Sequence, residues 1–176
     1  MPARPRAQSA RARRRAAARR AMMTLALGAW LVLFALEAAA VGGALVGMVT
    51  LADLENDFVN PHDCARRANA AAAAEVGAHA AAGAAALLSG RWIVLLLQAA
   101  ALGIVLRDAL ARGHGATAAG VRAALAVDPT DVFATLQEEK TRRAVRLSAH
   151  MAIFVVVTVR LVQAALSTLV ALDPLR

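Results

Sequence analysis

The sequence predicts an all-α integral membrane protein, a compact bundle of four transmembrane helices whose central pair forms a short helical hairpin. Of its 176 residues, 60% are apolar and only 18% are charged, which is more apolar surface than a soluble domain of this size can bury. Three or four apolar runs approach the roughly 20 residues that a helix needs to cross a hydrocarbon core. Three spans, with a central hairpin that does not fully cross, are the alternative.

The apolar runs set the order of the elements along the chain. A membrane domain over residues 22–171 precedes a short tail, residues 172–176, and carries one long polar loop, residues 107–143. Its predicted spans are residues 22–49, 70–88, 92–106 and 144–171. The second run is mostly alanine and is therefore a marginal span, and the Ser-Gly-Arg sequence after it predicts the tight turn of the hairpin. Trp92 then lies where an interfacial anchor belongs.

The net charge of +8 comes from the first 21 residues, which we expect to be a disordered extension. Eight of the twenty Lys and Arg residues lie in the first twenty positions, and the other twelve equal the twelve acids in number. No aromatic residues are interleaved with these arginines, which argues against nucleic-acid binding. Juxtamembrane contact with anionic lipid is the expected use. An organelle transit peptide, which has a similar acid-free composition, is the alternative.

The two span counts place the basic tail on different sides of the membrane. With three spans, the tail shares a side with the 107–143 loop, and fourteen of the twenty bases lie there, as the positive-inside rule favours. With four spans, the tail lies opposite that loop. Both arrangements allow the loop to be cytosolic and the C-terminus to lie across the membrane.

Polar and small residues inside the spans predict helix contacts. Glu37 is alone in the first run, where an isolated carboxylate must face other helices or water, or be protonated. Gly43 and Gly47 form a G-x-x-x-G spacing that lets another helix approach closely. Glu75 and His79 lie four residues apart on one face of the second run.

The sequence contains no grouping that predicts catalysis, a metal site or a cofactor. A nucleophile with a base and an orienting group is not recognisable. The single cysteine, Cys64, excludes an internal disulfide and leaves too few soft ligands for zinc. Asp53, Glu55 and Asp57 alternate as in a calcium loop, but the sixth position is Phe58 in place of glycine and the twelfth is the cysteine in place of Glu. These departures exclude an EF-hand.

The polar passage between the first two runs carries the most specific pattern in the chain. On chemistry alone it is typical of a solvated acidic loop at the membrane surface. Its sequence closely resembles the D-L-E-N-D-[YF]-x-N-P signature of the cornichon family. The matching residues are Asp53, Leu54, Glu55, Asn56, Asp57, Phe58, Asn60 and Pro61.

The resemblance continues downstream at the family's spacing. The residues that follow the signature at the family's intervals are Asn69, Glu75, His79 and Trp92. Residues 128–136, D-P-T-D-V-F-A-T-L, look like a second family segment, and His150 and Arg160 match the last span of fungal-type members. The similarity covers residues 22–170, so the basic extension precedes the family's usual start.

The resemblance implies a cargo receptor that resides in the endoplasmic reticulum membrane and cycles to the Golgi. Its spans would bind the transmembrane parts of client proteins, and its cytosolic face would engage the COPII coat of budding vesicles. Candidates for intramembrane client contact are Glu75, His79 and Arg160. Val132, Phe133 and Leu136 look like the family's coat-contacting I-F-x-x-L patch, which can form a small apolar knob on a short helix. Packing of Phe133 on the membrane surface is the alternative.

Two other functions stay open. An auxiliary subunit of a membrane channel or receptor would use the same spans against one client, so the number of co-purifying clients would distinguish it. A small proton-coupled transporter would use the polar residues of the spans, but four short spans without an internal repeat argue against it. Neither the client nor the oligomeric state is specified by the sequence.

Overall fold

The chain folds into helices, as the sequence predicts. The computed structural model describes residues 4–172, which contain no strand. The helices are α1 (Arg4–Glu55), α2 (Pro61–Leu88), α3 (Trp92–Ala111), α4 (Ala118–Leu125) and α5 (Val132–Leu172). Within this part of the chain, α1, α2, α3 and α5 are long and apolar enough to cross a membrane. The predicted fold class, a helical membrane bundle with four candidate spans, is therefore confirmed.

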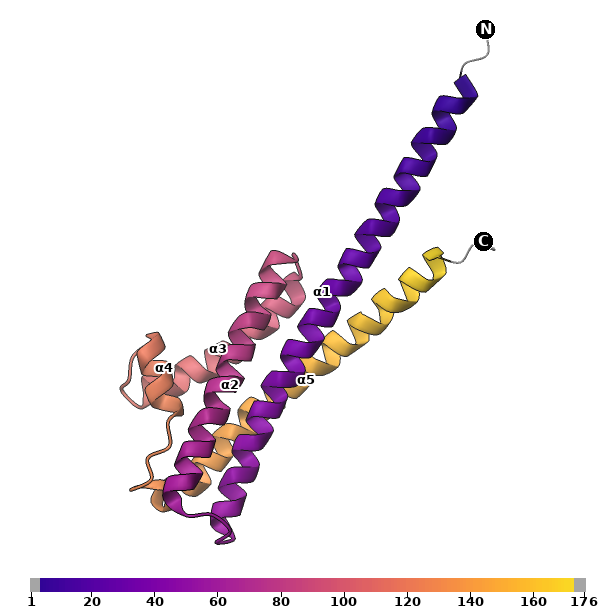
Figure 1. Ribbon diagram of the computed structural model, residues 1–176. Helices are drawn as coiled ribbons and strands as arrows, with labels where there is room; N and C mark the ends of the chain where they lie inside the picture. Colours follow the sequence, from indigo (N-terminus) through magenta and orange to yellow (C-terminus); the bar gives the residue numbers. More distant parts are fainter. Residues whose placement is uncertain (1–3, 173–176) are drawn as a thin grey trace.

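The four long helices alternate in direction. α1 packs along both α2 and α5, while α3 packs against α2 and α5, and the short α4 lies against α3 (Figure 1). The N-terminal part of α1 and the C-terminal part of α5 both extend past the α2–α3 turn on the same side of the bundle, which we call the terminal end (Figure 1). The α1–α2 turn and the start of α5 lie at the other side, the turn end. This arrangement favours four crossings over three, because α2 and α3 each have the length of a span.

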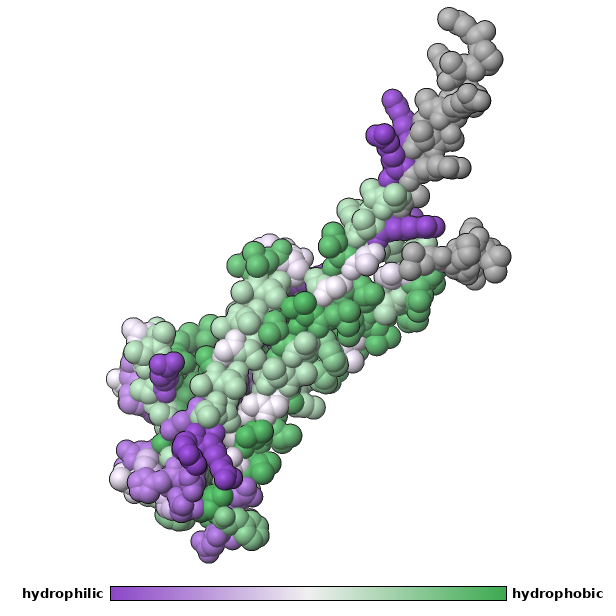
Figure 2. All heavy atoms as spheres, viewed as in Figure 1, coloured by the Kyte–Doolittle hydropathy of each residue, from purple (hydrophilic) through white to green (hydrophobic). Residues whose placement is uncertain are grey.

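The surface of the bundle is suited to a bilayer. Figure 2 shows hydrophilic atoms on the N-terminal part of α1 and at the turn end, with a broad hydrophobic band between them. At most 33% of the most apolar window of any candidate span is buried inside the protein. The rest of that apolar surface needs a hydrocarbon solvent, because exposing it to water is unfavourable at about 25 cal/mol per Å².

The helices extend further along the chain than the predicted membrane spans. α1 begins at Arg4, whereas the sequence analysis expects a disordered extension through residue 21. Alanine and arginine are among the strongest helix formers, which explains why an Ala/Arg-rich segment continues the helix of the first span. α2 begins at Pro61 in place of residue 70, and α3 ends at Ala111 in place of residue 106. The last four residues of the predicted tail lie outside the described part of the chain.

The 107–143 segment is largely helical and is anchored to α2. It contains the end of α3, all of α4 and the start of α5. The Asn69 side chain binds both polar groups of the Val127 backbone, accepting from its N–H at 2.7 Å and donating to its carbonyl at 3.2 Å. Just before α5, Asp128 accepts hydrogen bonds from the hydroxyl and N–H of Thr130, and these bonds lower the pKa of Asp128.

Two apolar clusters stabilise the bundle, one toward each end. The cluster toward the terminal end is formed by Trp30, Leu33, Ala82, Ala86, Val94, Ala101, Ile153 and Val157. The cluster toward the turn end is formed by Leu51, Leu54, Cys64, Ala65, Ala68, Val127, Val132 and Leu136. Between these clusters along the helices lies a set of buried polar side chains, which forms the candidate site.

Candidate functional site: a buried polar layer and the turn end

The signature residues build the turn that joins α1 to α2. The Phe58 N–H donates to the Asp53 carbonyl at 2.8 Å and the Asp57 N–H donates to the Leu54 carbonyl at 3.1 Å, the pair of bonds that closes a helix in a Schellman motif. Asp57 has φ of +59°, in the left-handed region that Asp and Asn tolerate better than most residues. The signature therefore begins as the C-terminal cap of α1.

The same passage then opens α2. The Asn60 side chain accepts from the Asp63 N–H at 2.8 Å and Pro61 occupies the first turn of the helix, both typical of a helix start. Asn60 is therefore the N-cap of α2, and the Asp63 carboxylate in the first turn accepts from the Asn60 amide at 2.8 Å.

Glu55 connects the signature to α5. Its carboxylate accepts from Lys140 Nζ at 2.5 Å and from the Gln137 amide at 3.0 Å. Leu54 is buried in the apolar cluster of this end, whereas Phe58 is 78% exposed. The turn thus fixes α1 against α2 and α5 while it presents one large aromatic side chain to the surroundings.

Gly43 and Gly47 lie at two different helix contacts of α1. A Cβ atom at Gly43 would be 3.0 Å from the backbone nitrogen of Glu75 on α2. A Cβ atom at Gly47 would overlap the guanidinium of Arg143 on α5. Both glycines therefore lie at contacts between helices of this chain. Gly43 faces the backbone of α2, and Gly47 faces a side chain of α5.

A buried polar layer crosses the middle of the bundle. Its buried members are Glu37 of α1, Glu75 of α2, Gln98 of α3, and Arg146 and His150 of α5, and it also includes the half-buried His79 of α2. Glu37 is 0% exposed and Glu75 is 2% exposed. Buried charges at this depth are stable only when they are paired and hydrogen-bonded.

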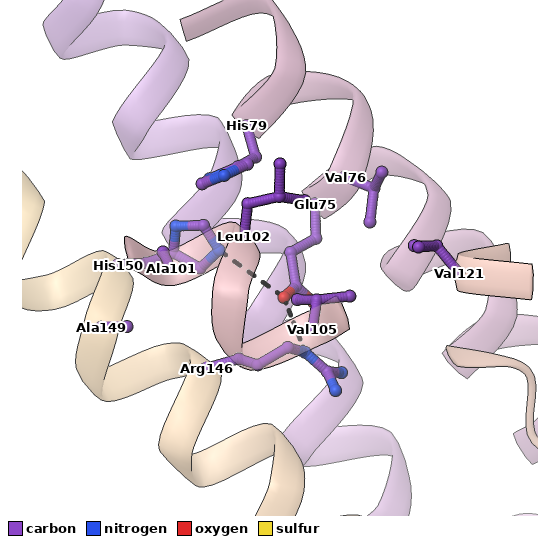
Figure 3. A pocket seen from close by; sticks show the side chains of 10 residues that line it. All are labelled: Glu75, Val76, His79, Ala101, Leu102, Val105, Val121, Arg146, Ala149 and His150. Atoms are coloured by element: carbon purple, nitrogen blue, oxygen red, sulfur yellow. Dashed lines mark hydrogen bonds and ion pairs between the residues drawn. The ribbon is translucent and has the colours of Figure 1, made fainter. Parts of the chain in front are cut away.

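Glu75 is the centre of the layer. Arg146 Nε donates to Glu75 Oε1 at 3.0 Å, and His150 Nε2 lies 3.6 Å from the same oxygen (Figure 3). The other ring nitrogen of His150, Nδ1, lies 3.8 Å from Glu37 Oε2. His150 is therefore located between two carboxylates that come from different helices.

α3 completes the layer. The Gln98 side chain donates to the Glu37 carboxylate, and the backbone carbonyl of Gln98 accepts from His79 Nε2 at 3.1 Å. The rings of His79 and His150 meet edge to face with centroids 5.2 Å apart. Every one of the four long helices thus contributes at least one polar group to the same connected set.

A small cavity borders the layer. It has a volume of about 30 Å³ and lies between α2, α3, α4 and α5. Figure 3 shows that Glu75, His79, Arg146 and His150 line it together with apolar side chains such as Leu102. A space of this size and polarity fits one or two water molecules and no larger ligand.

Arg143 extends the charged region toward the turn end. Its side chain is fully buried, and none of its three guanidinium nitrogens has a hydrogen-bond partner within the described residues. It lies one helical turn from Arg146 and against Gly47. A closer approach of α1 and α5 at this point is therefore limited by the guanidinium.

The predicted site residues fall into separate places. Glu75 and His79 belong to the polar layer, but Arg160 is exposed on α5 and lies outside it. Of the three predicted coat-patch residues, Val132 and Leu136 are buried in the apolar cluster, at 0% and 8% exposure, and only Phe133 is exposed, at 60%. The patch is therefore not a three-residue apolar knob in this structure.

Four members of the layer were not predicted as site residues: Glu37, Gln98, Arg146 and His150. A sequence signal exists for two of them, because Arg146 and His150 follow Arg143 at intervals of three and then four residues, which places all three on one face of a helix. A polar stripe at this spacing on an otherwise apolar helix predicts a buried partner. Glu37 is isolated within its own run, and its partner Gln98 on α3 can be identified only from the arrangement of the whole bundle.

The fold and the layer define a small polytopic helical membrane protein whose spans are joined by a buried charged network. Within residues 4–172, no group of three or more His, Cys, Asp or Glu side chains is placed to hold a metal ion. The family model described as "Cornichon protein" matches residues 26–159. The chain belongs to the cornichon family.

Curated relatives from plants agree with this assignment. The chain is 28% identical to Protein cornichon homolog 2 of Oryza sativa subsp. japonica over 151 residues, covering 86% of this chain and 94% of that protein. It is 32% identical to Protein cornichon homolog 1 of the same plant, covering 67% of this chain and 79% of that protein. Protein cornichon homolog 4 of Arabidopsis thaliana is also 32% identical, covering 68% of this chain and 79% of that protein. No solved structure matches the chain.

Proposed function

We propose that this protein is a membrane cargo adaptor that selects transmembrane client proteins and links them to COPII vesicles for transport from the endoplasmic reticulum to the Golgi. The observation that carries the proposal is the cornichon family match over residues 26–159. The matched residues include the signature and the greater part of each of the four candidate spans. The adaptor works by binding, and its proposed client and coat contacts lie in different parts of the bundle.

The client contact that we propose is the lipid-facing side of α1 and α2. An open groove of about 720 Å³ runs there, lined by small residues such as Gly42, Ala70 and Ala74 and by the exposed side chains of Val46 and Val49. Small residues let a second helix approach closely, which is the main source of helix association in a membrane. Glu75 is buried against Arg146, so its role in this proposal is to hold α2 in position.

The coat contact that we propose is at the turn end. Two of the chain's four phenylalanines, Phe58 and Phe133, are exposed there, at 78% and 60%. Exposed aromatic side chains are typical anchors of small protein interfaces. This function requires the turn end to be cytosolic, so a tag inserted at Gly115 should be digested by protease added to intact microsomes, and its protection would contradict the orientation.

The basic N-terminal part of α1 is the proposed contact for anionic lipid. The described side chains Arg11, Arg14, Arg15, Arg19 and Arg20 are all exposed. Arginines next to a membrane span are attracted to anionic headgroups at the surface.

Proteomics of vesicles budded with and without this protein tests the adaptor function. Loss of several unrelated transmembrane clients from the vesicles would support it. Loss of a single channel or receptor would instead favour an auxiliary subunit of that protein. An unchanged vesicle content would contradict the proposal.

A further inference from the structure

The α2–α3 turn brings an arginine against α1. Arg91 Nη2 donates to the Ala26 carbonyl of α1 at 3.2 Å, and the guanidinium lies over the Trp30 ring, 4.3 Å from its centroid. Arg91 Nε is buried and has no hydrogen-bond partner within the described residues. Its guanidinium is therefore held in place, with part of its hydrogen-bonding capacity unused.

Arg160 of α5 lies at the same level of the bundle. The rings of Phe34 and Phe154 pack with centroids 5.1 Å apart, which sets the register between α1 and the antiparallel α5. Because the two helices are antiparallel and rise equally per residue, counting outward from this contact brings residues 26–30 level with residues 158–162. Val157, one turn before Arg160, packs in the same apolar cluster as Trp30 and as Val94, which is one turn after Arg91. Burial and, second, the charge of Arg160 lower the pKa of Arg91.

This region contains no negative charge to neutralise the two arginines. Residues 4–36, 76–107 and 140–172 contain no Asp or Glu, and they include all of the described chain around the α2–α3 turn. Within that chain neither Arg91 nor Arg160 forms an ion pair. Among the described residues, no acid competes for these two guanidinium groups, so both are available to an anion from outside the protein.

The two arginines also lie nearer to the middle of the bundle than the last exposed apolar side chains of α1 and α5. α5 continues for twelve residues past Arg160, which is about 18 Å at 1.5 Å per residue, and α1 continues past the α2–α3 turn in the same direction (Figure 1). Large apolar side chains are exposed along both extensions, among them Met22, Leu25, Leu166 and Leu169. If these side chains contact hydrocarbon, the two guanidinium groups lie deeper than the surrounding headgroups.

We propose that Arg91 and Arg160 bind the phosphate of a phospholipid headgroup, which is drawn inward at the point where the α2–α3 turn ends short of α1 and α5. Arginine is suited to this ligand because its planar guanidinium binds phosphate oxygens with two parallel hydrogen bonds. The bilayer leaflet at the terminal end is locally thinned beside the α2–α3 turn. The site needs neither client nor coat, so its test is separate from that of the adaptor function.

Depth-dependent quenching of tryptophan fluorescence tests the site in the full-length protein. The chain has two tryptophans, Trp30 and Trp92, and both lie next to Arg91. The protein is reconstituted in phosphatidylcholine vesicles that carry either a nitroxide on the headgroup or bromine in the middle of the acyl chain. We expect strong headgroup quenching in the natural protein and a lower headgroup-to-chain ratio in Arg91→Gln/Arg160→Gln. Each arginine removed should weaken headgroup association about fivefold.

Matched variants distinguish the site from a general effect of charge. Arg66→Gln/Arg107→Gln removes two exposed arginines toward the turn end and should leave the ratio unchanged. Because Arg91→Gln also removes a contact to α1, the single variant Arg160→Gln is decisive. If folded Arg160→Gln has the same headgroup-to-chain quenching ratio as the natural protein, the proposal is overturned. Addition of inorganic phosphate should not alter the natural ratio. A decrease toward that of the double variant would identify free phosphate as the ligand and overturn the lipid assignment.

Discussion

The turn end and the terminal end of the bundle use their charges differently. At the turn end, Glu55 of α1 binds Lys140 of α5, and Glu139 of α5 binds Arg112 at the end of α3. At the terminal end, the described residues carry arginines and no acid. Charges at the turn end are therefore used to hold helices together, whereas those at the terminal end are available to a partner outside the protein. The polar layer lies between the two ends and holds together the four helices that connect them.

The largest effect is expected from breaking the polar layer. Glu75→Ala leaves Arg146 buried without its carboxylate, and loss of one partner of a buried ion pair typically costs about 3–5 kcal/mol of unfolding free energy. The free energy of unfolding in detergent micelles measures this change. Glu138→Ala, which removes an ion pair with a 61% exposed carboxylate, is the matched control and should change stability by at most about 1 kcal/mol. Equal effects of the two substitutions would contradict a structural role of the layer.

The next effect concerns coat binding by the turn end. Phe133→Ala removes an exposed aromatic side chain, and such anchors contribute about 1–3 kcal/mol, so packaging into vesicles should fall roughly ten- to a hundredfold. Membrane insertion and client binding should persist, since Phe133 projects from the surface of the bundle. A budding assay that measures packaging per folded molecule checks this.

Leu136→Ala separates coat binding from packing. Leu136 is 8% exposed, so its truncation should lower the amount of folded protein while the remaining molecules are packaged normally. Normal packaging of Phe133→Ala per folded molecule would remove Phe133 from the proposed coat contact.

A smaller effect is expected from the α1–α2 turn itself. Asn60→Ala removes the side-chain cap of α2, which typically costs about 0.5–2 kcal/mol. The free energy of unfolding again measures the change. His62→Ala, in the same turn of the helix but exposed, is the control and should be neutral. A neutral Asn60→Ala would indicate that the signature is retained for a partner and not for the turn.

The smallest effect is expected from removing the basic extension. A chain that starts at Met22 should be exported with the efficiency of the full chain, because the family match begins only at residue 26. Vesicle packaging of the shortened chain checks this expectation. Failure of the shortened chain to reach the endoplasmic reticulum would contradict it, as would delivery of a reporter to a plastid or mitochondrion by residues 1–21.

The spans could be predicted from the sequence because the bilayer imposes a length and a composition on every helix that crosses it. The turn at Ser89-Gly90 was predicted for a similar reason, since Gly90 has φ of +67° and few other residues adopt that conformation. The predicted second span begins at residue 70, whereas α2 itself begins nine residues earlier, at Pro61. The polar side chains after Pro61 lie on a helix that extends beyond the apolar run.

The site was harder to predict because its members come from separate helices. Glu37, Gln98 and His150 interact only in the register that the bundle adopts, and a pattern along one helix does not fix that register. The burial of two of the three predicted coat-patch residues has a local reason. Val132 and Leu136 share a helix face and turn inward, whereas Phe133 lies about 100° around the helix from Val132 and turns outward.

The polar layer also has a consequence for how the protein is made. Glu37 enters the membrane with the first span and Glu75 with the second, but both histidine and arginine partners, His150 and Arg146, belong to the last helix synthesised. Until α5 inserts, Glu37 and Glu75 lack the basic side chains that contact them in the finished bundle, in a solvent that penalises unpaired charge. Insertion of the last span is therefore the step that gives the acidic side chains of the first two spans their partners. A nascent chain truncated before α5 differs from a finished one because these acidic groups are still unpaired in the membrane.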